Sequence, residues 1–221
     1  MCGRFTIQYT WAEYYQALNL IPASAKGRND PPRFNVCPTQ SIGMVCTDNG
    51  EIVVKDARWG LVPHWAKDLK IKPMINARSE TVAEKPMFKS SFATRRCLIP
   101  ANSFYEWDRK TDPDAPLPYN IHLKSGEPFF FAGIWRYHKH LYVTSCAILT
   151  TAPHDNIAFV HDRMPVILNA ETWQTWVSPE TETDEALTLI SQNRGADLTA
   201  YRVGTAVNKN TAQGAELIEP I

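Results

Sequence analysis

The chain has 221 residues, a hydrophobic fraction of 44%, an aromatic fraction of 11% and a formal net charge of +0. This composition is typical of a globular protein rather than a disordered tail, and the neutral total argues against a protein that coats nucleic acid by bulk charge. No apolar run reaches the length of a membrane span, and the sequence does not begin with a basic region followed by an apolar stretch. We therefore expect no membrane span and no signal peptide, and a cytoplasmic protein.

Five cysteines occur in the chain, and their spacing argues against a disulfide framework or a zinc site. The number is odd and no two form a C-x-x-C pair. We therefore expect reduced thiols, and neither a metal nor another cofactor. The cysteines are Cys2, Cys37, Cys46, Cys97 and Cys146.

The first half of the chain carries mainly strand signals around one helix. Thr10 and Glu13 have the spacing of a capping box, which predicts a helix from Thr10 to about Leu20. Asp48-Asn49-Gly50 lies between two apolar runs and predicts a hairpin. The other expected elements are a strand over 4–8, a long loop over 22–40, hairpin strands over 42–47 and 52–55, a third strand over 57–61, and a loop over 63–73 that contains Trp65.

The second half continues with short strands and helices that do not alternate regularly. That pattern predicts one α+β domain over residues 1–221, with a curved, mostly antiparallel sheet or barrel core and peripheral helices. It disfavours a doubly wound nucleotide-binding fold. The expected elements are a broken helix over 80–93, strands over 97–100, 104–107, 119–122, 129–135, 141–150, 165–168 and 216–219, and helices over 170–176 and 184–192.

Cys2 is the residue with the most distinctive chemistry. Its position lets methionine aminopeptidase remove Met1, after which Cys2 carries a free α-amine beside its thiol. This 1,2-aminothiol can trap an aldehyde, because the amine forms an imine and the thiolate then closes a thiazolidine ring. An α-amine pKa of ~8 and a thiol pKa of ~8.5 bring both groups within reach of neutral pH. The alternative is a Met-Cys start that arose by chance.

Three polar residues in or beside apolar runs could assist such chemistry. Glu106 interrupts an aromatic run, which would raise its pKa as a general acid or base requires; the alternative is a strand whose wet face carries Glu106. His161 could relay protons, or be a structural histidine bonded to the backbone. Asn76 could orient a substrate or the Cys2 amine, or cap a turn.

Basic residues suggest a phosphate-binding face despite the neutral total. Residues 64–96 hold eight basic and three acidic residues, a net of +5, whereas residues 171–200 hold one basic and six acidic residues, a net of −5. Arg4, Arg78 and Arg163 are suitable phosphate ligands. The alternative is that these charges are solvated or form surface ion pairs.

Together these segments resemble the SOS-response-associated peptidase (SRAP) family of abasic-site processing proteins over nearly the whole chain. Several separate motifs occur in the family's order. They are Met1-Cys2-Gly3-Arg4-Phe5, Arg33-Phe34-Asn35-Val36 with Pro38-Thr39, Trp59-Gly60-Leu61-Val62-Pro63 with Trp65, Asn76-Ala77-Arg78-Ser79-Glu80, Cys97-Leu98-Ile99-Pro100-Ala101, Phe104-Tyr105-Glu106-Trp107, His161-Asp162-Arg163-Met164-Pro165 and Val207-Asn208.

The resemblance implies a DNA-repair protein that binds single-stranded DNA at abasic sites. Cys2 would form a thiazolidine crosslink with the ring-opened deoxyribose and so divert strand cleavage by β-elimination. Asn76 would hold the cysteine and the sugar, Glu106 would handle protons, and His161 would assist ring opening and crosslink reversal.

The same resemblance implies how DNA is held. Arg4, Arg78 and Arg163 would bind phosphates around the lesion. Trp65, Met87 and Phe88 would lie where the family wedges and kinks DNA bases. A second aromatic wedge beside Trp65 is not expected, because Ala66-Lys67-Asp68 follows it. The expected partner is single-stranded DNA with abasic sites, bound by a monomer that is associated with the nucleoid while on DNA.

Two other functions remain open at this point. The family's peptidase label refers to self-removal of residues before the cysteine, and here an aminopeptidase suffices because only Met1 precedes Cys2. An amidohydrolase or peptidase with Cys2 as its N-terminal nucleophile is one alternative. A non-catalytic single-stranded DNA binder that uses Trp65 and the basic segment is the other.

Overall fold

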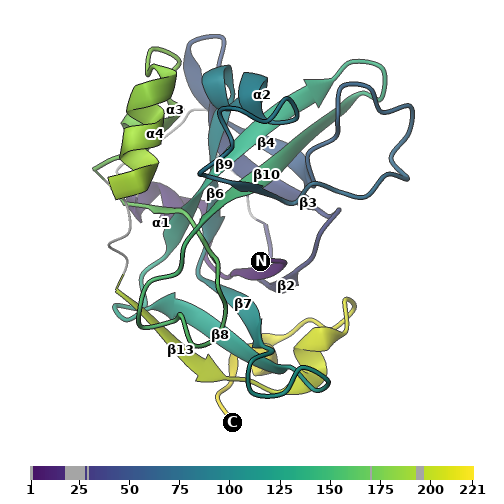
Figure 1. Cartoon of the computed structure of the whole chain (residues 1–221), viewed down its shortest axis with the longest axis vertical. Helices are drawn as coiled ribbons and strands as arrows, with labels where there is room; N and C mark the ends of the chain where they lie inside the picture. Colours follow the sequence, from purple (N-terminus) through teal and green to yellow (C-terminus); the bar gives the residue numbers. More distant parts are fainter. Residues whose placement is uncertain (1, 18–27, 29, 170, 193–196) are drawn as a thin grey trace.

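A computed structural model describes residues 2–17, 28, 30–169, 171–192 and 197–221, and the fold is built around two β-sheets (Figure 1). The first sheet has five strands in the order β13-β8-β7-β1-β2, and every neighbouring pair is antiparallel. Its strands are β1 (Arg4–Ile7), β2 (Arg33–Val36), β7 (Ser103–Asp108), β8 (Leu117–Leu123) and β13 (Leu198–Arg202).

The second sheet closes on itself. Strand β10 pairs with both β4 and β9, and the chain of pairs β4–β3, β3–β6 and β6–β9 completes a ring of five strands. The strands of the ring are β3 (Ser41–Asp48), β4 (Glu51–Trp59), β6 (Arg96–Ala101), β9 (Phe129–His138) and β10 (Val143–Thr151). Three short strands extend the sheet: β5 (Asn76–Arg78), β11 (Met164–Pro165) and β12 (Ile167–Leu168). The predicted α+β fold with a mostly antiparallel barrel core is confirmed.

Short helices lie around the sheets. They are α1 (Trp11–Ala17), α2 (Lys89–Thr94), α3 (Trp173–Val177), α4 (Thr183–Gln192) and the 3₁₀ helices η2 (Thr205–Asn208) and η3 (Ala215–Ile218). Within the described ranges, no helix is both long enough and apolar enough to cross a bilayer.

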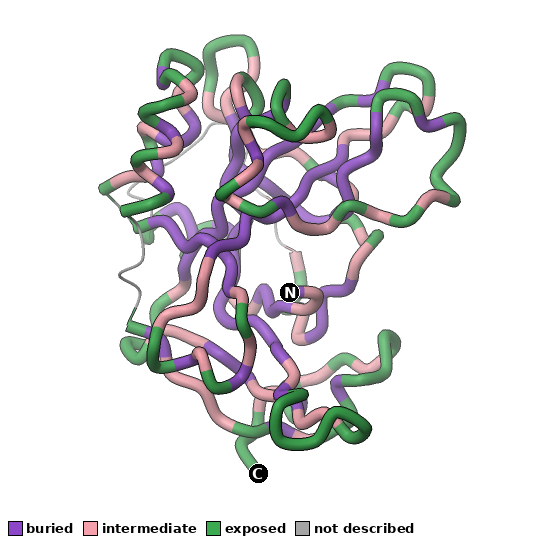
Figure 2. The backbone as a smooth tube through the Cα atoms, viewed as in Figure 1, coloured by how far each residue is buried: buried purple, intermediate pink, exposed green. Residues whose placement is uncertain are grey.

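The core runs through the barrel and into its junction with the five-stranded sheet (Figure 2). Phe5 of β1 makes edge-on ring contacts with Trp59 of β4 and Phe131 of β9, at centroid distances of 5.0 and 5.5 Å. The first strand of one sheet is therefore packed against two strands of the other. This contact fixes where the start of the chain lies.

Local signals in the sequence located several elements correctly. The backbone amide of Thr10 donates to the Glu13 carboxylate at 2.7 Å and that of Glu13 to the Thr10 hydroxyl at 3.4 Å, which confirms the capping box. The β3–β4 turn has positive φ at Asn49 (51°) and Gly50 (82°), as a tight hairpin turn requires. The helix is described as far as Ala17, and residues 18–20 of the prediction lie outside the described residues.

Other expectations were wrong where pairing depends on distant residues. The predicted loop over 22–40 contains β2, and the separate strand predicted over 57–61 is the end of β4 up to Trp59. The predicted strand over 216–219 is instead η3, because its backbone turns through a hydrogen bond from Leu217 N–H to the Gly214 carbonyl. Strand β13 was not predicted.

Candidate functional site

Cys2 lies fully buried (0% exposed) just before β1, at the junction of the two sheets. The side-chain amide of Asn76, the first residue of β5, donates to the Cys2 carbonyl at 2.9 Å. The other polar atom of this side chain, Asn76 Oδ1, is buried and accepts no hydrogen bond from any described residue. Because buried polar atoms are normally paired, this oxygen is suited to accept from an amine or a sugar hydroxyl.

Glu106 of β7 is buried beside His161. Glu106 is only 3% exposed, and its Oε2 lies 4.0 Å from His161 Nε2. Burial raises the pKa of Glu106 to about 7, so the carboxyl can both donate and accept a proton near neutral pH. The alternative in which Glu106 occupies the wet face of a strand is wrong.

His161 is held in a neutral form that suits proton relay. Burial lowers the pKa of the imidazole, which favours the uncharged ring. The Arg163 backbone amide donates to Nδ1 at 3.0 Å. A carboxylate oxygen of Asp162 also lies 2.9 Å from Nδ1, and the other ring nitrogen, Nε2, faces Glu106. We call Cys2, Asn76, Glu106 and His161 the reaction centre.

The Cys2 thiol is in its protonated form at rest. Burial raises the pKa of this thiol strongly, and the charge of nearby Glu106 raises it further. The sulfur makes a weak hydrogen bond to the Arg4 carbonyl at 3.8 Å. A thiol in this environment needs a nearby base before it can attack.

The three predicted phosphate-binding arginines are differently engaged. Arg163 forms two hydrogen bonds to the Glu80 carboxylate, at 2.6 and 2.9 Å, and a third to the Thr150 carbonyl. The Arg163 guanidinium holds the pKa of Glu80 below its usual value. Arg78, at the end of β5, is exposed. Arg163 is therefore paired within the protein and Arg78 is open to solvent.

Arg4 ties the start of the chain to a segment near residue 208. Its guanidinium donates to Asn35 Oδ1 at 2.8 Å and to the Val207 carbonyl at 2.7 Å. It also donates to the Asn208 carbonyl at 3.4 Å and to the Asn210 side chain. These bonds fix the direction in which β1 leaves Cys2.

The residues predicted to wedge DNA fall in two environments. Trp65 is 65% exposed in the loop between β4 and β5. Met87 and Phe88 are partly buried against the core, and the Met87 carbonyl accepts a hydrogen bond from Arg136 at 3.0 Å. Trp65 is thus available for stacking, whereas Met87 and Phe88 are largely held by the protein.

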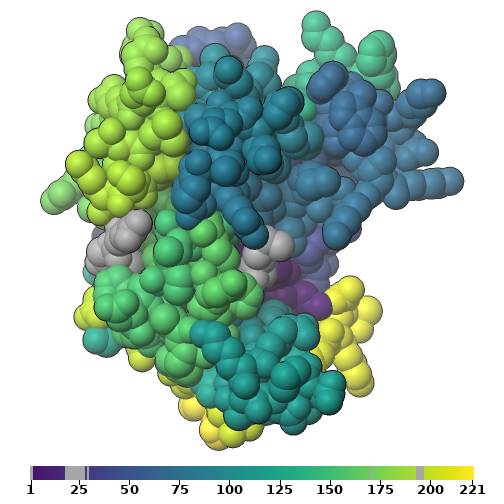
Figure 3. All heavy atoms as spheres, in the orientation of Figure 1, coloured from purple at the N-terminus to yellow at the C-terminus, as the bar shows by residue number. Residues whose placement is uncertain are grey.

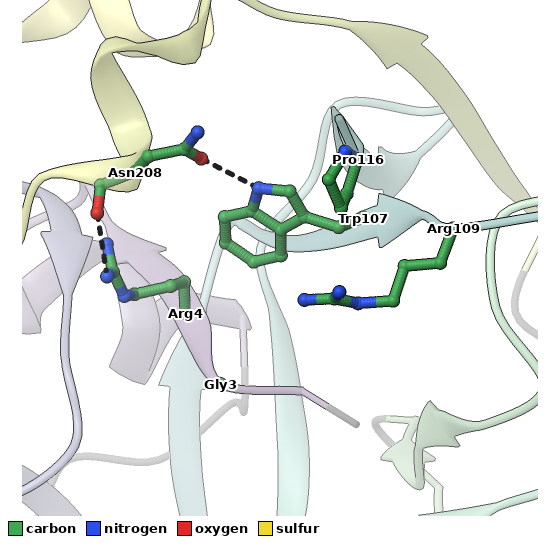
Figure 4. A pocket seen from close by; sticks show the side chains of 6 residues that line it. All are labelled: Gly3, Arg4, Trp107, Arg109, Pro116 and Asn208. Carbon is green, nitrogen blue, oxygen red and sulfur yellow. Dashed lines mark hydrogen bonds between the residues drawn. The ribbon is translucent and has the colours of Figure 1, made fainter. Parts of the chain in front are cut away.

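A pocket of 390 Å³ opens beside Gly3, next to Cys2 (Figure 4). The Trp107 indole lies in this pocket between the Arg4 and Arg109 side chains, and its Nε1 donates to Asn208 Oδ1 at 2.7 Å. The Arg4 guanidinium lies 6.0 Å from the indole centroid. The sequence predictions did not single out Trp107, Arg109 and Asn208, although the first and last occur in motifs that carried the resemblance.

The pocket has the size and chemistry of a small ligand site. An aromatic face with cations on two sides can accept a base and its phosphate. Among the described residues, no three His, Cys, Asp or Glu side chains are grouped so that they could hold a metal ion.

Proteins of similar sequence carry a common description. The Bacillus subtilis abasic site processing protein YoqW is 40% identical over 224 residues, which are 99% of each chain. The Escherichia coli abasic site processing protein YedK is 29% identical over 228 residues and both full lengths. The rat abasic site processing protein HMCES is 29% identical, over 86% of this chain and 65% of its own.

Solved structures show the same fold. A Bacteroides thetaiotaomicron protein superposes with a TM-score of 0.80 and 20% identity over 100% of both chains. A phage-related protein from Bordetella bronchiseptica superposes with a TM-score of 0.74 and 26% identity over 91% of this chain and 94% of its own. The family described as SOS response associated peptidase (SRAP) matches residues 1–210. The chain therefore belongs to the SRAP family.

Proposed function

We propose that this protein processes abasic sites in single-stranded DNA by forming a thiazolidine crosslink through Cys2 once Met1 has been removed. The observation that carries the proposal is the buried cysteine beside Asn76, with a carboxyl of near-neutral pKa in Glu106 at the same site. The relatives' printed descriptions as abasic site processing proteins support it.

The chemistry needs two proton transfers that one near-neutral acid can serve. The Cys2 amine adds to the sugar aldehyde, and Glu106 protonates the hydroxyl of this adduct so that it leaves as water and a protonated imine remains. The Cys2 sulfur then bonds to the imine carbon and the thiol proton passes to Glu106. One C–N and one C–S bond form, one water is released, and Glu106 ends as it began.

The other members of the reaction centre have supporting roles in this proposal. Asn76 holds the Cys2 backbone through the bond to its carbonyl, and Asn76 Oδ1 is a suitable acceptor for the new amine or a sugar hydroxyl. His161, neutral and within 4.0 Å of Glu106, would relay protons during ring opening and reversal. Arg4, Arg78 and Arg163 remain the proposed phosphate ligands, although Arg163 must exchange Glu80 for a phosphate oxygen.

An N-terminal cysteine peptidase is less well supported. Such an enzyme makes its first bond through sulfur, and burial raises the pKa of the Cys2 thiol, so a base must take the thiol proton as that first bond forms. Attack by the amine first does not need a thiolate, because the thiol is deprotonated only during ring closure. The amine-first order therefore suits this site better.

The decisive test is intact-mass and denaturing-gel analysis with single-stranded DNA that contains one abasic site. The mass of the free protein reports whether Met1 is lost, and the adduct should equal protein plus DNA minus one water. Cys2→Ala should abolish the stable adduct, and Cys2→Ser should leave at most a transient imine. A stable adduct formed by Cys2→Ala would refute the proposal.

A further inference from the structure

Exposed apolar side chains gather on two segments away from the reaction centre. Among the described residues, seven large hydrophobic side chains are exposed, and five of them belong to the loop over 64–74 or to the β9–β10 hairpin. These five are Trp65, Leu69, Met74, Tyr137 and Tyr142. We call residues 64–74 and 137–142 the loop–hairpin surface; in Figure 3 the blue loop and the blue-green hairpin lie side by side.

His138 joins the two halves of this surface. The Leu141 backbone amide donates to His138 Nδ1 at 3.2 Å, so Nε2 carries the proton and donates to the His64 carbonyl, also at 3.2 Å. The ring is buried between them. The hairpin tip is thus fastened to the residue that precedes Trp65.

The surface is also basic. Its exposed lysines are Lys67, Lys70, Lys72 and Lys139, and its acidic residue is Asp68. In the part of the chain that the structure describes, no ion pair involves any of these lysines. Exposed aromatic rings among unpaired cations form the combination that binds single-stranded nucleic acid, because bases stack on the rings and phosphates meet the cations.

Tyr142 occupies a position that disfavours it. It is 83% exposed, and its φ of 51° lies in the left-handed region that glycine adopts most readily. A large exposed ring on a left-handed backbone contributes little to the fold, so it is a candidate for contact with a ligand.

Strand β10 links this surface to the reaction centre. Ile148 of β10 is in register with Asn76, and Tyr142 precedes Ile148 by six positions. At about 3.3 Å per residue, Tyr142 lies roughly 20 Å from the reaction centre along β10. That span corresponds to about six nucleotides of stacked strand.

We propose that the β9–β10 hairpin, through Tyr142 and Lys139, binds single-stranded DNA about six nucleotides to one side of the lesion, as an extension of the Trp65 loop. The identity of the ligand, single-stranded DNA, rests on the proposed function. The tyrosine stacks on a base and the lysine neutralises a phosphate.

The test compares Tyr142→Gly with Asn49→Gly, a matched change at an exposed turn residue that has the same φ of 51°. Affinities are measured by fluorescence anisotropy for intact strands and for strands with the abasic site near the 5′ or the 3′ end. Tyr142→Gly should weaken binding by about five- to a hundredfold for intact strands. It should weaken binding equally for one of the two abasic strands, the one whose longer DNA arm extends from the lesion toward the hairpin. Asn49→Gly should leave binding unchanged, and both variants should keep the parental melting temperature or exceed it.

A lysine pair tests the charge. Lys139→Ala should weaken binding and lower the salt dependence by about one phosphate contact, whereas Lys124→Ala, in a residue paired with Asp197, should not. The proposal would be overturned if Tyr142→Gly bound both abasic strands, with the site near the 5′ or near the 3′ end, as tightly as the parent protein does. It would also be overturned if the variant lost affinity for base-free polyphosphate by the same factor as for DNA. If the parent protein formed no crosslink, the proposed chemistry would be refuted. The affinities for intact strands would still test the hairpin, because they do not depend on a crosslink.

Discussion

The reaction centre and the loop–hairpin surface hold their side chains in opposite ways. Cys2 and Glu106 are enclosed where the two sheets meet, at 0% and 3% exposure, and their pKa values are raised by burial. Trp65 and Tyr142 project into solvent at 65% and 83% exposure. Enclosure tunes proton affinity, whereas exposure leaves rings free to stack, so we expect chemistry and affinity to be separable by mutation.

The largest expected effect is on the chemical step. Glu106→Gln keeps the shape of the side chain but removes its proton transfer, so the single-turnover rate of crosslinking should fall by about 10²- to 10⁴-fold. Quenched time courses on a gel measure the rate, and anisotropy with intact DNA provides the control. If Glu106→Gln left the crosslinking rate unchanged, or lowered it only as much as it lowered the affinity for intact DNA, chemistry and binding would not be separate properties of the reaction centre and the loop–hairpin surface.

The same substitution should change how stability depends on pH. The pKa of Glu106 rises from 4.5 to about 7 in the folded protein, so between these values the folded state holds a proton that the unfolded state has lost. The stabilisation is complete below pH 4.5 and is lost as pH rises through about 7, by roughly 3 kcal/mol in total. Urea unfolding at pH 4.5 and pH 8 should show this loss in the parent and a much smaller one in Glu106→Gln. If the free energies of unfolding of the parent and of Glu106→Gln changed equally with pH, the Glu106 carboxyl would not be enclosed in the folded protein.

On the exposed surface the expected effect is smaller and affects binding alone. Trp65→Ala should weaken affinity for single-stranded DNA by about 1–3 kcal/mol, the range for one stacked base. Because the indole is largely solvated, the melting temperature should stay within about a degree or two of the parental value. At saturating DNA the crosslinking rate should be parental; a slower rate there would place Trp65 in the reaction itself.

The smallest expected effect is that of Asn76→Ala, which tests whether Asn76 acts only by positioning Cys2. Asn76→Ala removes one hydrogen bond to the Cys2 carbonyl, which is worth about 1 kcal/mol, so crosslinking should slow by roughly tenfold or less. The final yield of adduct should be unchanged because the bonds that form are the same. Single-turnover rates and end-point yields on the same gel distinguish these outcomes, and a lost yield would assign Asn76 a role in the adduct's stability.

Elements with local signals were predictable from sequence. The Thr10–Glu13 capping box and the Asn49-Gly50 turn are encoded by neighbouring residues, and both are present. Strands β2 and β13 were missed because their pairing partners, β1 and β8, lie far away in the sequence. Closure of the barrel through the β10–β4 and β10–β9 pairs is likewise a property of the assembled sheet.

The candidate site could be predicted in part for the same reason. The motifs identified Cys2, Asn76 and Glu106, and the structure brings them together. They could not show that Arg163 pairs with Glu80, because these residues are 83 positions apart and meet only in the fold. Tyr142 carried no signal, since a tyrosine near a strand end is ordinary until its exposure and left-handed backbone are known.

The bonds from Arg4 to the segment near residue 208 set an order of events during synthesis. Arg4 and Val207 are 203 positions apart, so the ribosome adds the carbonyl that Arg4 binds long after the cysteine has emerged. Until then one wall of the pocket beside Gly3, which includes Asn208, is missing. In the proposed mechanism, a nascent chain would therefore carry its aminothiol before the pocket beside Gly3 is complete, and the whole site would assemble only when translation is nearly finished.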